Sequence, residues 1–518
     1  MSRELEAVIP SLVIRADSTT QIGTGHIMRC IALAQAWQDH GGKVIFISHC
    51  ESEALHQRII DEGFDFISVE NPHPNPDDLF QTLAYLKRLS PFTFHLSPAW
   101  FVLDGYHFTP DYQKAIRDTG ILLLVIDDMN HLPHYHADIL LNQNINAPGL
   151  HYHCDEDATL LLGTRYVLLR REFLKYRDFK RQIPERAKNI LVTLGGGDPD
   201  NVTIKVIEAI KLLNNQNLEV KVVVGPSNPH VAEIKNSMLS ALCPMHCIEN
   251  AENMPELMVW ADMAISAGGS TCWELAFMGL PSLLVILAEN QVELAEHLET
   301  QRAAVNIGWC NMFSSEQLSA KINVLIRDKN LRKSISKNAS SLVDGKGASR
   351  VTIVMICNLI TLRRVTYDDC NMIWQWSNEE ETRKVSFSQG LISWDEHVQW
   401  FKEKLADPNH VFFIATNGNK NPLGQIRYSI EGKKAIVSFS IAPESRNLGY
   451  GSEVLRVAAR KLFHETEVEE ILAFVKDENS VSFKTFQNAG FKKKGELFLH
   501  GTKSYKFVLI KQNRHEID

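Results

Sequence analysis

Several features that narrow the function of a protein at once are missing from this chain of 518 residues. No apolar run approaches the ~20 residues of a membrane-spanning helix. The segment Met1 to Val8 carries charges of both signs and lacks the apolar core of a signal peptide. The formal net charge of −8 is modest for this length, so electrostatics gives no reason to expect nucleic acid or a membrane as a partner. We therefore expect a cytoplasmic protein.

A cysteine pattern that would indicate disulfides or a zinc site is also missing. The nine cysteines are scattered, and their odd number favours free thiols in a reducing compartment. No two close pairs of cysteine or histidine occur at the spacing of a zinc finger. We expect no metal in this protein, and we find no long internal repeat and no low-complexity tract.

The sequence does contain a regular alternation of short apolar runs with longer runs of helical periodicity. The runs Leu12–Ala16 and Leu122–Ile126 are predicted strands of this kind. Such alternation is typical of a parallel sheet covered by helices. A basic connector at residues 170–188 interrupts the pattern, which then restarts. The predicted class is α/β, with two Rossmann-like halves that face each other across a cleft, residues 10–168 and 186–350.

A third region with a different texture follows a break at Asp344–Ser349. Its predicted strands are longer, and they are followed by a glycine-containing turn into a helix. We expect residues 361–513 to form a separate mixed α+β domain.

The first motif that carries chemistry runs from Arg15 to Cys30. Gly23 and Gly25 allow a tight turn after the predicted strand, and His26 and Arg29 lie on the first turn of the helix that follows. Ligands of open α/β sheets bind at the carboxyl ends of strands. Free amides and the positive end of the helix dipole favour a phosphate there. We therefore expect an anion-binding loop beside His26 and Arg29.

Three later segments also follow predicted strands and begin helices. Because glycine loops and helix N-termini present free amides, these segments could together surround a diphosphate. Glu274 could accept hydrogen bonds from ribose hydroxyls, and amide side chains can both donate and accept, as sugar recognition requires. The candidate residues are Gly196, Gly268, Gly269, Ser270, Thr271, Glu274, Asn290 and Gln291.

At these motifs residues 10–350 resemble PseG, the UDP-sugar hydrolase family of pseudaminic acid biosynthesis. The resemblance implies the two-domain glycosyltransferase-B fold, related to the lipid II-forming transferase MurG. It implies hydrolysis of UDP-2,4-diacetamido-2,4,6-trideoxy-β-L-altropyranose with inversion at the anomeric carbon. It also implies that His26 is the base and that Gly268–Glu274 binds UDP. The motifs that carry it are Arg15-Ala-Asp17, Gly23–Arg29, Gly195–Pro199, Gly268–Glu274 and Glu289–Gln291.

Elementary chemistry agrees with a histidine base. An imidazole with an ordinary pKa of ~6.5 can take a proton from water near neutral pH. UDP is a weakly basic leaving group, so amides and helix dipoles can stabilise its charge without a general acid. Asp17 could orient the imidazole, contact the sugar or brace its loop. Arg15, Arg29 and Tyr106 are further candidates for substrate contact, with packing as the alternative for Tyr106.

In the third region, the spacing Arg446-x-x-Gly449-x-Gly451 places a row of amides at a predicted helix start, which is a second pyrophosphate cradle. With the later residues Asn479 and Phe486, the order resembles the GNAT acetyltransferase family. The part around Trp374–Asn378 and Ile392–Trp400 is similar to PseH, the acetyltransferase that precedes PseG. The resemblance implies acetyl-CoA as co-substrate, with the pantetheine arm along the strand near Ser440. The implied cofactor-binding residues are Ile441, Arg446, Asn447, Gly449, Tyr450, Gly451, Asn479 and Phe486.

One position departs from the family pattern. Many GNAT enzymes have a tyrosine at the position of Phe486, where it protonates the departing CoA thiolate. Phe486 has no proton to give, so the proton must come from Tyr450, Tyr505 or water, or the acetylation is slower.

The sequence therefore predicts a bifunctional enzyme that acetylates the 4-amino group of a UDP-4-amino-sugar and then removes UDP from the product. Its small-molecule partners are a UDP-sugar and acetyl-CoA. Two alternatives stay open: a glycosyltransferase whose acceptor is not water, and a third domain that binds CoA or a nucleotide sugar without catalysis.

Overall fold

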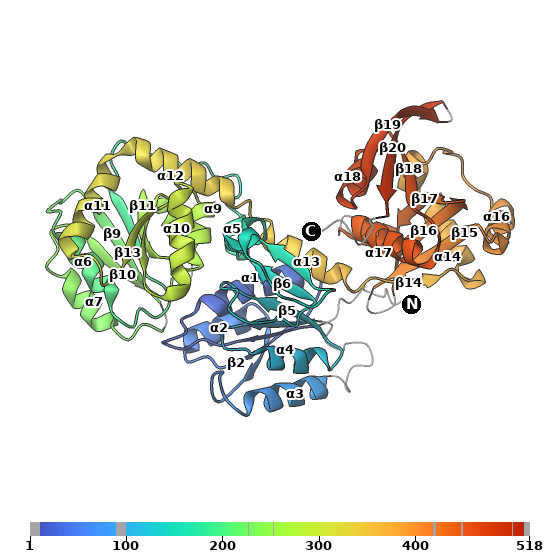
Figure 1. Cartoon of the computed structure of the whole chain (residues 1–518). Coiled ribbons are helices and arrows are strands. Elements are labelled where there is room, and N and C mark those ends of the chain that lie inside the picture. The colour runs from blue at the N-terminus through green and yellow to red at the C-terminus, as the bar shows by residue number, and fades with distance from the viewer. Residues whose placement is uncertain are drawn as a thin grey trace. The chain divides into compact units, whose positions relative to one another are not determined.

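The computed structural model describes residues 11–89, 100–225, 227–251, 253–417, 421–446, 449–499 and 501–511. The chain divides into two compact units, with the boundary after Thr352, inside helix α13 (Gly347–Cys357) (Figure 1). Within the described ranges, no helix is both long and apolar enough to cross a membrane.

The first half of the N-terminal unit is a seven-stranded parallel sheet in the order β3-β2-β1-β4-β5-β6-β7. Its central strands are buried on both faces, which explains their continuous apolar sequences. The strands are β1 Leu12–Ala16, β2 Val44–Ser48, β3 Asp65–Ser68, β4 Trp100–Asp104, β5 Leu122–Ile126, β6 Ile139–Asn142 and β7 Thr159–Leu162.

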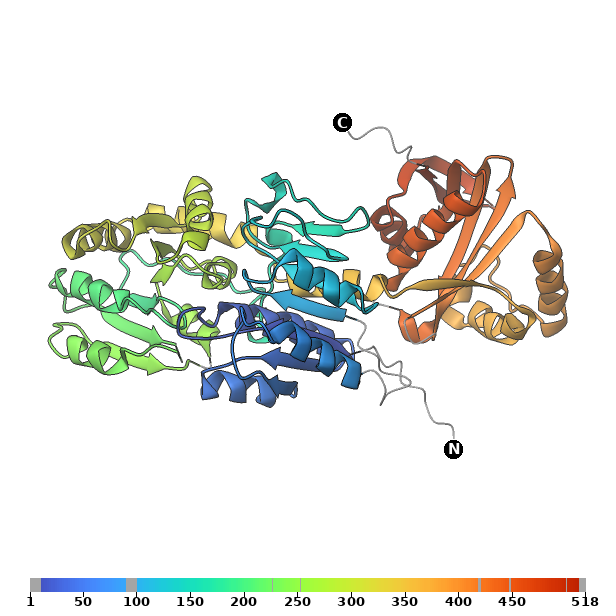
Figure 2. The same ribbon diagram turned by 60° about the horizontal axis from the view of Figure 1, so that its bottom comes forward.

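Helices lie on both faces of this sheet, with α1 and α2 on one side and α3 and α4 on the other (Figures 1 and 2). Because β1 is flanked by β2 and β4, the strand order reverses at β1, and a crevice is expected at the carboxyl end of that strand. The helices are α1 Gly25–Asp39, α2 Glu53–Asp61, α3 Asp78–Leu89 and α4 Pro110–Arg117, with short helices η1 Ala147–Gly149 and η2 Thr164–Tyr166.

The second half is a six-stranded parallel sheet in the order β10-β9-β8-β11-β12-β13. Its strands are β8 Asn189–Thr193, β9 Glu219–Val224, β10 Met245–Glu249, β11 Met263–Ala267, β12 Ser282–Ile286 and β13 Val305–Trp309. In Figure 1 this sheet lies between α6, α7 and α11 on one side and α9 and α10 on the other. The helices are α5 Arg171–Leu174 in the connector, α6 Val202–Lys211, α7 Val231–Met238, α8 Met254–Trp260, α9 Thr271–Phe277, η3 Glu289–Gln291, α10 Val292–Thr300, α11 Ser315–Arg327 and α12 Lys329–Leu342.

The C-terminal unit has one seven-stranded mixed sheet in the order β14-β15-β16-β17-β18-β20-β19. The strands are β14 Thr361–Arg364, β15 His410–Thr416, β16 Pro422–Glu431, β17 Lys434–Ile441, β18 Glu470–Lys476, β19 Lys492–Leu499 and β20 Thr502–Ile510. The helices are η4 Tyr367–Asp369, α14 Cys370–Asn378, α15 Glu380–Val385, α16 Trp394–Ala406, η5 Pro443–Ser445, α17 Tyr450–Glu465 and α18 Ser480–Asn488.

The parallel pair β17 and β18 is the notable feature of this sheet. The two strands pair only from Lys434 to Ile436, so they separate towards Ile441. The other strand pairs of this sheet are antiparallel. The predicted fold class, two Rossmann-like halves followed by a mixed α+β domain, is confirmed.

Candidate active sites

A cleft of about 1220 Å³ lies between the two halves of the N-terminal unit. Its walls are the loops that follow β1, β4, β5 and β6 in the first half and β8, β9, β11 and β12 in the second. Parallel strands end at the same edge of a sheet, so each half presents all its loops to the same space. The volume exceeds that of ordinary drug-sized pockets and admits a ligand of nucleotide size.

Glycine lets the two halves approach closely on one side of this cleft. A Cβ atom on Gly196 would lie 2.6 Å from Cγ2 of Thr24, and one on Gly197 would lie 2.6 Å from the carbonyl oxygen of Thr20. Real side chains do not tolerate such distances. The loop after β8 therefore needs glycine to lie against the loop after β1.

The centre of the first half is an ionic cluster around His26. Nδ1 of His26 lies 2.7 Å from Oδ1 of Asp104, the last residue of β4. Nε and Nη2 of Arg29 donate to the two oxygens of the same carboxylate, each at 2.7 Å. The carboxylate favours a proton on Nδ1, which leaves Nε2 of His26 as the atom with the free electron pair. The ring is thereby oriented as a base.

The charge of Asp104 is maintained by its neighbours. Burial alone would raise the pKa of this carboxyl, but Arg29 and His26 outweigh burial and hold the pKa well below its ordinary value. Asp104 is therefore ionised at neutral pH and can stabilise a positive charge on His26.

Hydrogen bonds extend from this cluster to the second half. Nη1 of Arg29 donates to Asp128 at 2.7 Å, and the hydroxyl of Tyr106 donates to the same carboxylate at 2.6 Å. Nδ2 of Asn290, from the second half, donates to the Tyr106 hydroxyl at 3.1 Å. The ring of Tyr106 also meets the ring of His26 edge-on, with centroids 4.9 Å apart. Tyr106 thus connects His26 to the opposite wall.

Two expectations need correction. Asp17 lines the cleft but does not orient the imidazole, because its oxygens accept from the amides of His49 at 2.7 Å and His73 at 2.9 Å, and it pairs with Arg15. Arg15 is not positioned to contact a substrate. Its side chain is fully buried, and it also pairs with Asp78 at 2.7 Å. Asp17 therefore connects the loop after β1 to the segments that follow β2 and β3.

Sequence reasoning missed Asp104 and Asp128. Asp104 ends the buried strand β4, which is next to β1, and Asp128 follows β5, which is next to β4; a position at the carboxyl end of a buried strand was the available signal. Tyr106 is the one site residue predicted from sequence in the segment after β4.

The second half supplies the other predicted residues. Oε1 of Glu274 accepts from Nη2 of Arg170 at 2.8 Å, and burial raises the pKa of Glu274 although Arg170 opposes the shift. Ser270 precedes α9 without a side-chain cap, so the first amides of that helix keep no side-chain acceptor. Oε1 of Gln291 accepts from the amide of Leu287 at 2.9 Å. The predicted residues that line the cleft here and opposite are Gly23, Gly25, His26, Arg29, Tyr106, Gly196, Gly268, Gly269, Ser270, Thr271, Glu274, Asn290 and Gln291.

In the C-terminal unit, α17 begins beside the point where β17 and β18 separate. Gly449 has a φ of 85°, which favours glycine, and no side-chain cap occupies the first turn of α17. Gly451 allows a close approach to α18, since a Cβ atom there would lie 3.0 Å from Cγ2 of Thr485. Asn447, another predicted residue of this cradle, lies outside the described residues.

Arg446 makes a different set of contacts from those expected. Its guanidinium pairs with Glu379 at 2.9 Å and Glu381 at 3.0 Å, and its Nε donates to the carbonyl oxygen of Ile441 at 3.2 Å. In this arrangement Arg446 ties α15 to the end of β17 and is not directed at a pyrophosphate.

Asn479 and Phe486 have structural contacts. Oδ1 of Asn479 accepts from the amide of Ser482 at 3.0 Å and caps α18. Phe486 is buried among aromatic rings, namely Phe439, Phe491 and Phe507.

The two tyrosines considered as proton donors differ. Burial raises the pKa of Tyr450 to about 12, so its hydroxyl keeps its proton at neutral pH. Tyr505 is half-buried, and its hydroxyl donates to Asp477.

One group of potential metal ligands occurs in the described part of the chain, and it lies outside the cleft. It consists of His134, His136 and Asp155, whose ligand atoms lie within 4.8 Å of one another. Arg117 pairs with the same carboxylate. This guanidinium would oppose a cation at Asp155.

Two segments of the chain match models of known protein families. Residues 189–350 match the glycosyltransferase family 28 C-terminal domain, and residues 360–492 match the acetyltransferase (GNAT) domain. The UDP-2,4-diacetamido-2,4,6-trideoxy-beta-L-altropyranose hydrolase of Campylobacter jejuni is 25% identical over 55% of this chain and 95% of its own length. The chain joins a PseG-like region to a GNAT domain. The predicted resemblance is thereby confirmed, and the C-terminal unit is an acetyltransferase domain, which implies use of acetyl-CoA.

Two other relatives align over longer segments. The uncharacterized protein MJ1062 of Methanocaldococcus jannaschii is 24% identical over 81% of this chain and 83% of its own length. The spore coat polysaccharide biosynthesis protein SpsG of Bacillus subtilis is 25% identical over 66% of this chain and 96% of its own length.

Proposed function

We propose that this PseG-like, GNAT-containing protein is a bifunctional enzyme of pseudaminic acid biosynthesis. Residues 10–168 and 186–350 form the hydrolase, which releases UDP from UDP-2,4-diacetamido-2,4,6-trideoxy-β-L-altropyranose with inversion. Residues 361–513 transfer an acetyl group from acetyl-CoA to the 4-amino group of the UDP-4-amino-sugar precursor. The observation that carries the hydrolase assignment is the hydrogen bond between Asp104 and His26 inside the cleft.

In the hydrolase, Nε2 of His26 takes a proton from water. The water oxygen bonds to the anomeric carbon on the face opposite the diphosphate, and the bond from that carbon to the UDP oxygen breaks with its electron pair leaving on UDP. Asp104 stabilises the imidazolium that forms, as carboxylates do in other histidine-dependent hydrolases. Arg29 holds Asp104 in place from the other side.

The charge that develops on UDP needs donors in the second half. The glycine loop before α9 and its junction with that helix supply backbone amides and the positive end of a helix dipole, whereas the amides of Cys272 and Trp273 already donate to the carbonyl oxygens of Gly269 and Ser270. The free oxygen of Glu274 is a suitable acceptor for a ribose hydroxyl, since Arg170 binds only its Oε1.

In the acetyltransferase, the 4-amino nitrogen attacks the carbonyl carbon of acetyl-CoA. The carbon–sulfur bond breaks, the thiolate leaves with the electron pair, and the nitrogen gives up one proton to water. Phe486 cannot protonate the thiolate. Tyr450 retains its proton at neutral pH, and it is the first residue of α17, whose N-terminal turn is the proposed cofactor cradle. We therefore assign it as the first candidate donor.

The hydrolase is tested by incubating the full chain with the UDP-sugar and no acceptor, with UDP release and NMR of the sugar as readouts. We expect UDP and free sugar of inverted configuration from the wild type. His26→Asn should lose activity, whereas His56→Gln, a half-exposed histidine outside the cleft, should not. Normal turnover by folded His26→Asn would remove His26 as the base.

The match of residues 189–350 to a glycosyltransferase family supports a second candidate, a transferase whose acceptor is not water. The same incubation separates the two, because absence of UDP release without an added acceptor favours the transferase. For the C-terminal domain, CoA thiol release on adding UDP-4-amino-sugar and acetyl-CoA distinguishes catalysis from mere binding.

A further inference from the structure

Arg427 on β16 carries a charge that the described residues do not neutralise. Its guanidinium stacks on the ring of Trp400, 4.8 Å from the centroid, and no described carboxylate pairs with it. Burial and, to a smaller extent, the charge of Arg383 together lower the pKa of Arg427 to about 10. The group is still protonated at neutral pH. A desolvated cation without a counter-charge is costly and favours an anionic partner.

Arg383, on α15, belongs to the same positive region. Its Nη1 donates to the carbonyl oxygens of Ser388 and Gly390, each at 3.1 Å, its Nη2 donates to Oγ of Ser386 at 3.2 Å, and its buried Nε has no partner. Burial lowers the pKa of both neighbouring histidines, His397 and His410, and Arg427 contributes to both shifts. At His410, Lys404 acts in the same direction as Arg427 and Asp407 opposes them. Among the described residues, neither Arg383 nor Arg427 forms an ion pair with a carboxylate.

Gln425 lies two residues before Arg427 on the same strand, so its side chain is on the same face of the sheet. It is 94% buried; its Nε2 donates to Oγ of Ser440 at 3.1 Å, while its Oε1 has no hydrogen-bond partner. Tyr428, the residue after Arg427, is on the opposite face. The face that carries Gln425 and Arg427 thus offers one unsatisfied acceptor and one unneutralised cation.

The position of this face relates it to acetyl transfer. Gln425 pairs in register with Ser440, and Arg427 pairs with Ser438, which is exposed. Both partners lie on the part of β17 that has separated from β18. The gap lies between β17 and β18, so Gln425 and Arg427 lie one strand away from the gap that we assign to the pantetheine arm of acetyl-CoA.

We propose that this face of β16 is the acceptor subsite of the acetyltransferase, with Arg427 binding an anionic phosphate of the acceptor and Oε1 of Gln425 accepting a hydrogen bond from its amine. Residues two apart on a strand are ~7 Å apart. The subsite thus suits an amine with a phosphate about one sugar ring away, which is the chemistry of a nucleoside diphosphate amino-sugar. This inference rests on the proposed function of the C-terminal domain.

The test is steady-state acetylation by the full chain, measured as CoA thiol release. The acceptors are the UDP-4-amino-sugar and the methyl glycoside of the same 4-amino-sugar, which has no phosphate. Arg427→Gln should raise the KM for the UDP-4-amino-sugar about 10- to 100-fold, the range for a charged hydrogen bond. The KM for acetyl-CoA and the rate with the methyl glycoside should not change.

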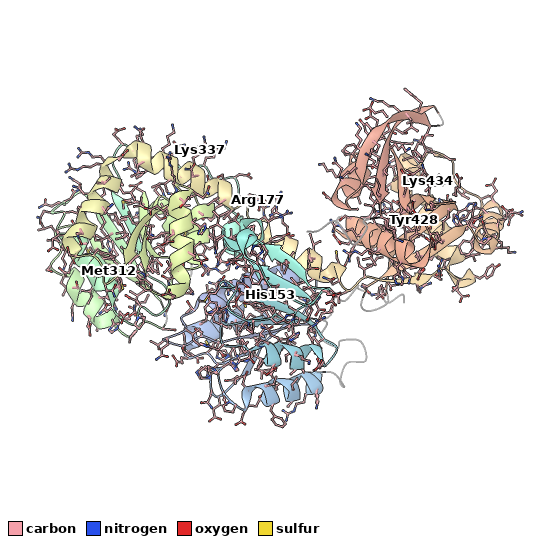
Figure 3. All side chains as sticks on the ribbon, viewed as in Figure 1. His153, Arg177, Met312, Lys337, Tyr428 and Lys434 are labelled. Carbon is pink, nitrogen blue, oxygen red and sulfur yellow. The ribbon has the colours of Figure 1, made fainter. Side chains whose placement is uncertain are left out.

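Lys434→Gln is the matched control, because it removes one positive charge from the exposed start of β17 in the same sheet (Figure 3). It should leave all these constants unchanged. Arg427→Lys keeps the charge without the planar fork, so it should give a smaller rise in KM and serves if Arg427→Gln does not fold. A rise in the KM for acetyl-CoA, or equal losses with both acceptors, would overturn the subsite.

A failure of the proposed function looks different. If the wild type does not acetylate the UDP-4-amino-sugar, an amino-sugar 1-phosphate and its methyl glycoside are compared instead. The subsite holds if the wild type prefers the phosphorylated amine and Arg427→Gln abolishes the preference. Equal rates, or acetylation of neither amine, overturn it.

Discussion

Nδ1 of His26 lies 2.7 Å from Oδ1 of Asp104, a residue 78 positions further along the chain. Arg29, one turn after His26, binds the same carboxylate through two nitrogens. This arrangement holds the imidazole ring through its Nδ1 and leaves Nε2 free. It distinguishes a base held for proton transfer from a histidine that merely lies near a phosphate.

We expect Asp104→Asn to retain the shape of this cluster but to lose the charge that stabilises the imidazolium and selects its tautomer. The kcat for UDP release should fall by about 10²- to 10⁴-fold, while the KM for the UDP-sugar changes little. Asp128→Asn is the control, because it removes a contact of Arg29 and Tyr106 and leaves the Asp104–His26 bond intact. Equal losses in both variants would show that the charge of Asp104 does not act specifically on the imidazole of His26.

The same carboxylate predicts a pH dependence of stability. The pKa of Asp104 is lowered in the folded protein, so its ionised form stabilises the fold above the unfolded value of about 3.9 and that stabilisation is lost as the pH falls towards the folded value. The difference in unfolding free energy between wild type and Asp104→Asn should therefore be constant from pH 7 to about pH 5 and shrink below about pH 4. Urea unfolding at several pH values measures it, and a difference that grows in acid contradicts the assignment.

Local features of this chain are predictable from sequence, whereas its ion pairs are not. The strands Leu12–Ala16 and Leu122–Ile126 occur where predicted, because a strand buried on both faces is a continuous apolar run. The glycine loops are also recognisable from local sequence, because each directly follows a predicted strand and precedes a predicted helix. His26 was identified as a candidate, but its partner is 78 positions away, and no local pattern specifies which carboxylate the fold brings to it.

Arg15 illustrates the opposite error. A charged residue inside an apolar strand and next to a glycine motif resembles a ligand-binding residue. Its charge is instead neutralised inside the sheet by Asp17 and by Asp78, which is 63 positions away. Only the three-dimensional fold shows that this arginine is satisfied.

Gly196 provides a test of the cleft itself. In Gly196→Ala, the new Cβ would lie 2.6 Å from Cγ2 of Thr24, so the loops after β1 and β8 must move apart. Since a displacement of about 1 Å can cost up to 100-fold, we expect kcat/KM for UDP release to fall about 10- to 100-fold. Thr24→Gly removes the atoms that clash, so the double variant should recover most of the activity. If the double variant is no better than Gly196→Ala, close approach of these loops is not the cause.

Arg446 separates a structural role from cofactor binding. Because its guanidinium is bound to Glu379, Glu381 and Thr382, Arg446→Gln should lower the stability of the acetyltransferase domain by about 1–3 kcal/mol. The KM for acetyl-CoA should change less than about twofold, because the group does not face the cradle. Calorimetric unfolding and acetyl-CoA titration measure the two effects on the same preparation.

Glu381→Gln is the control for this ion pair. The Glu381 side chain is 75% exposed, so its loss should cost less than about 1 kcal/mol. A tenfold rise in the KM for acetyl-CoA with unchanged stability in Arg446→Gln would mean that Arg446 leaves these carboxylates when the pyrophosphate binds. The carboxylates of Glu379 and Glu381 would then compete with the cofactor for one guanidinium, and Glu379→Gln should lower the KM for acetyl-CoA in that case alone.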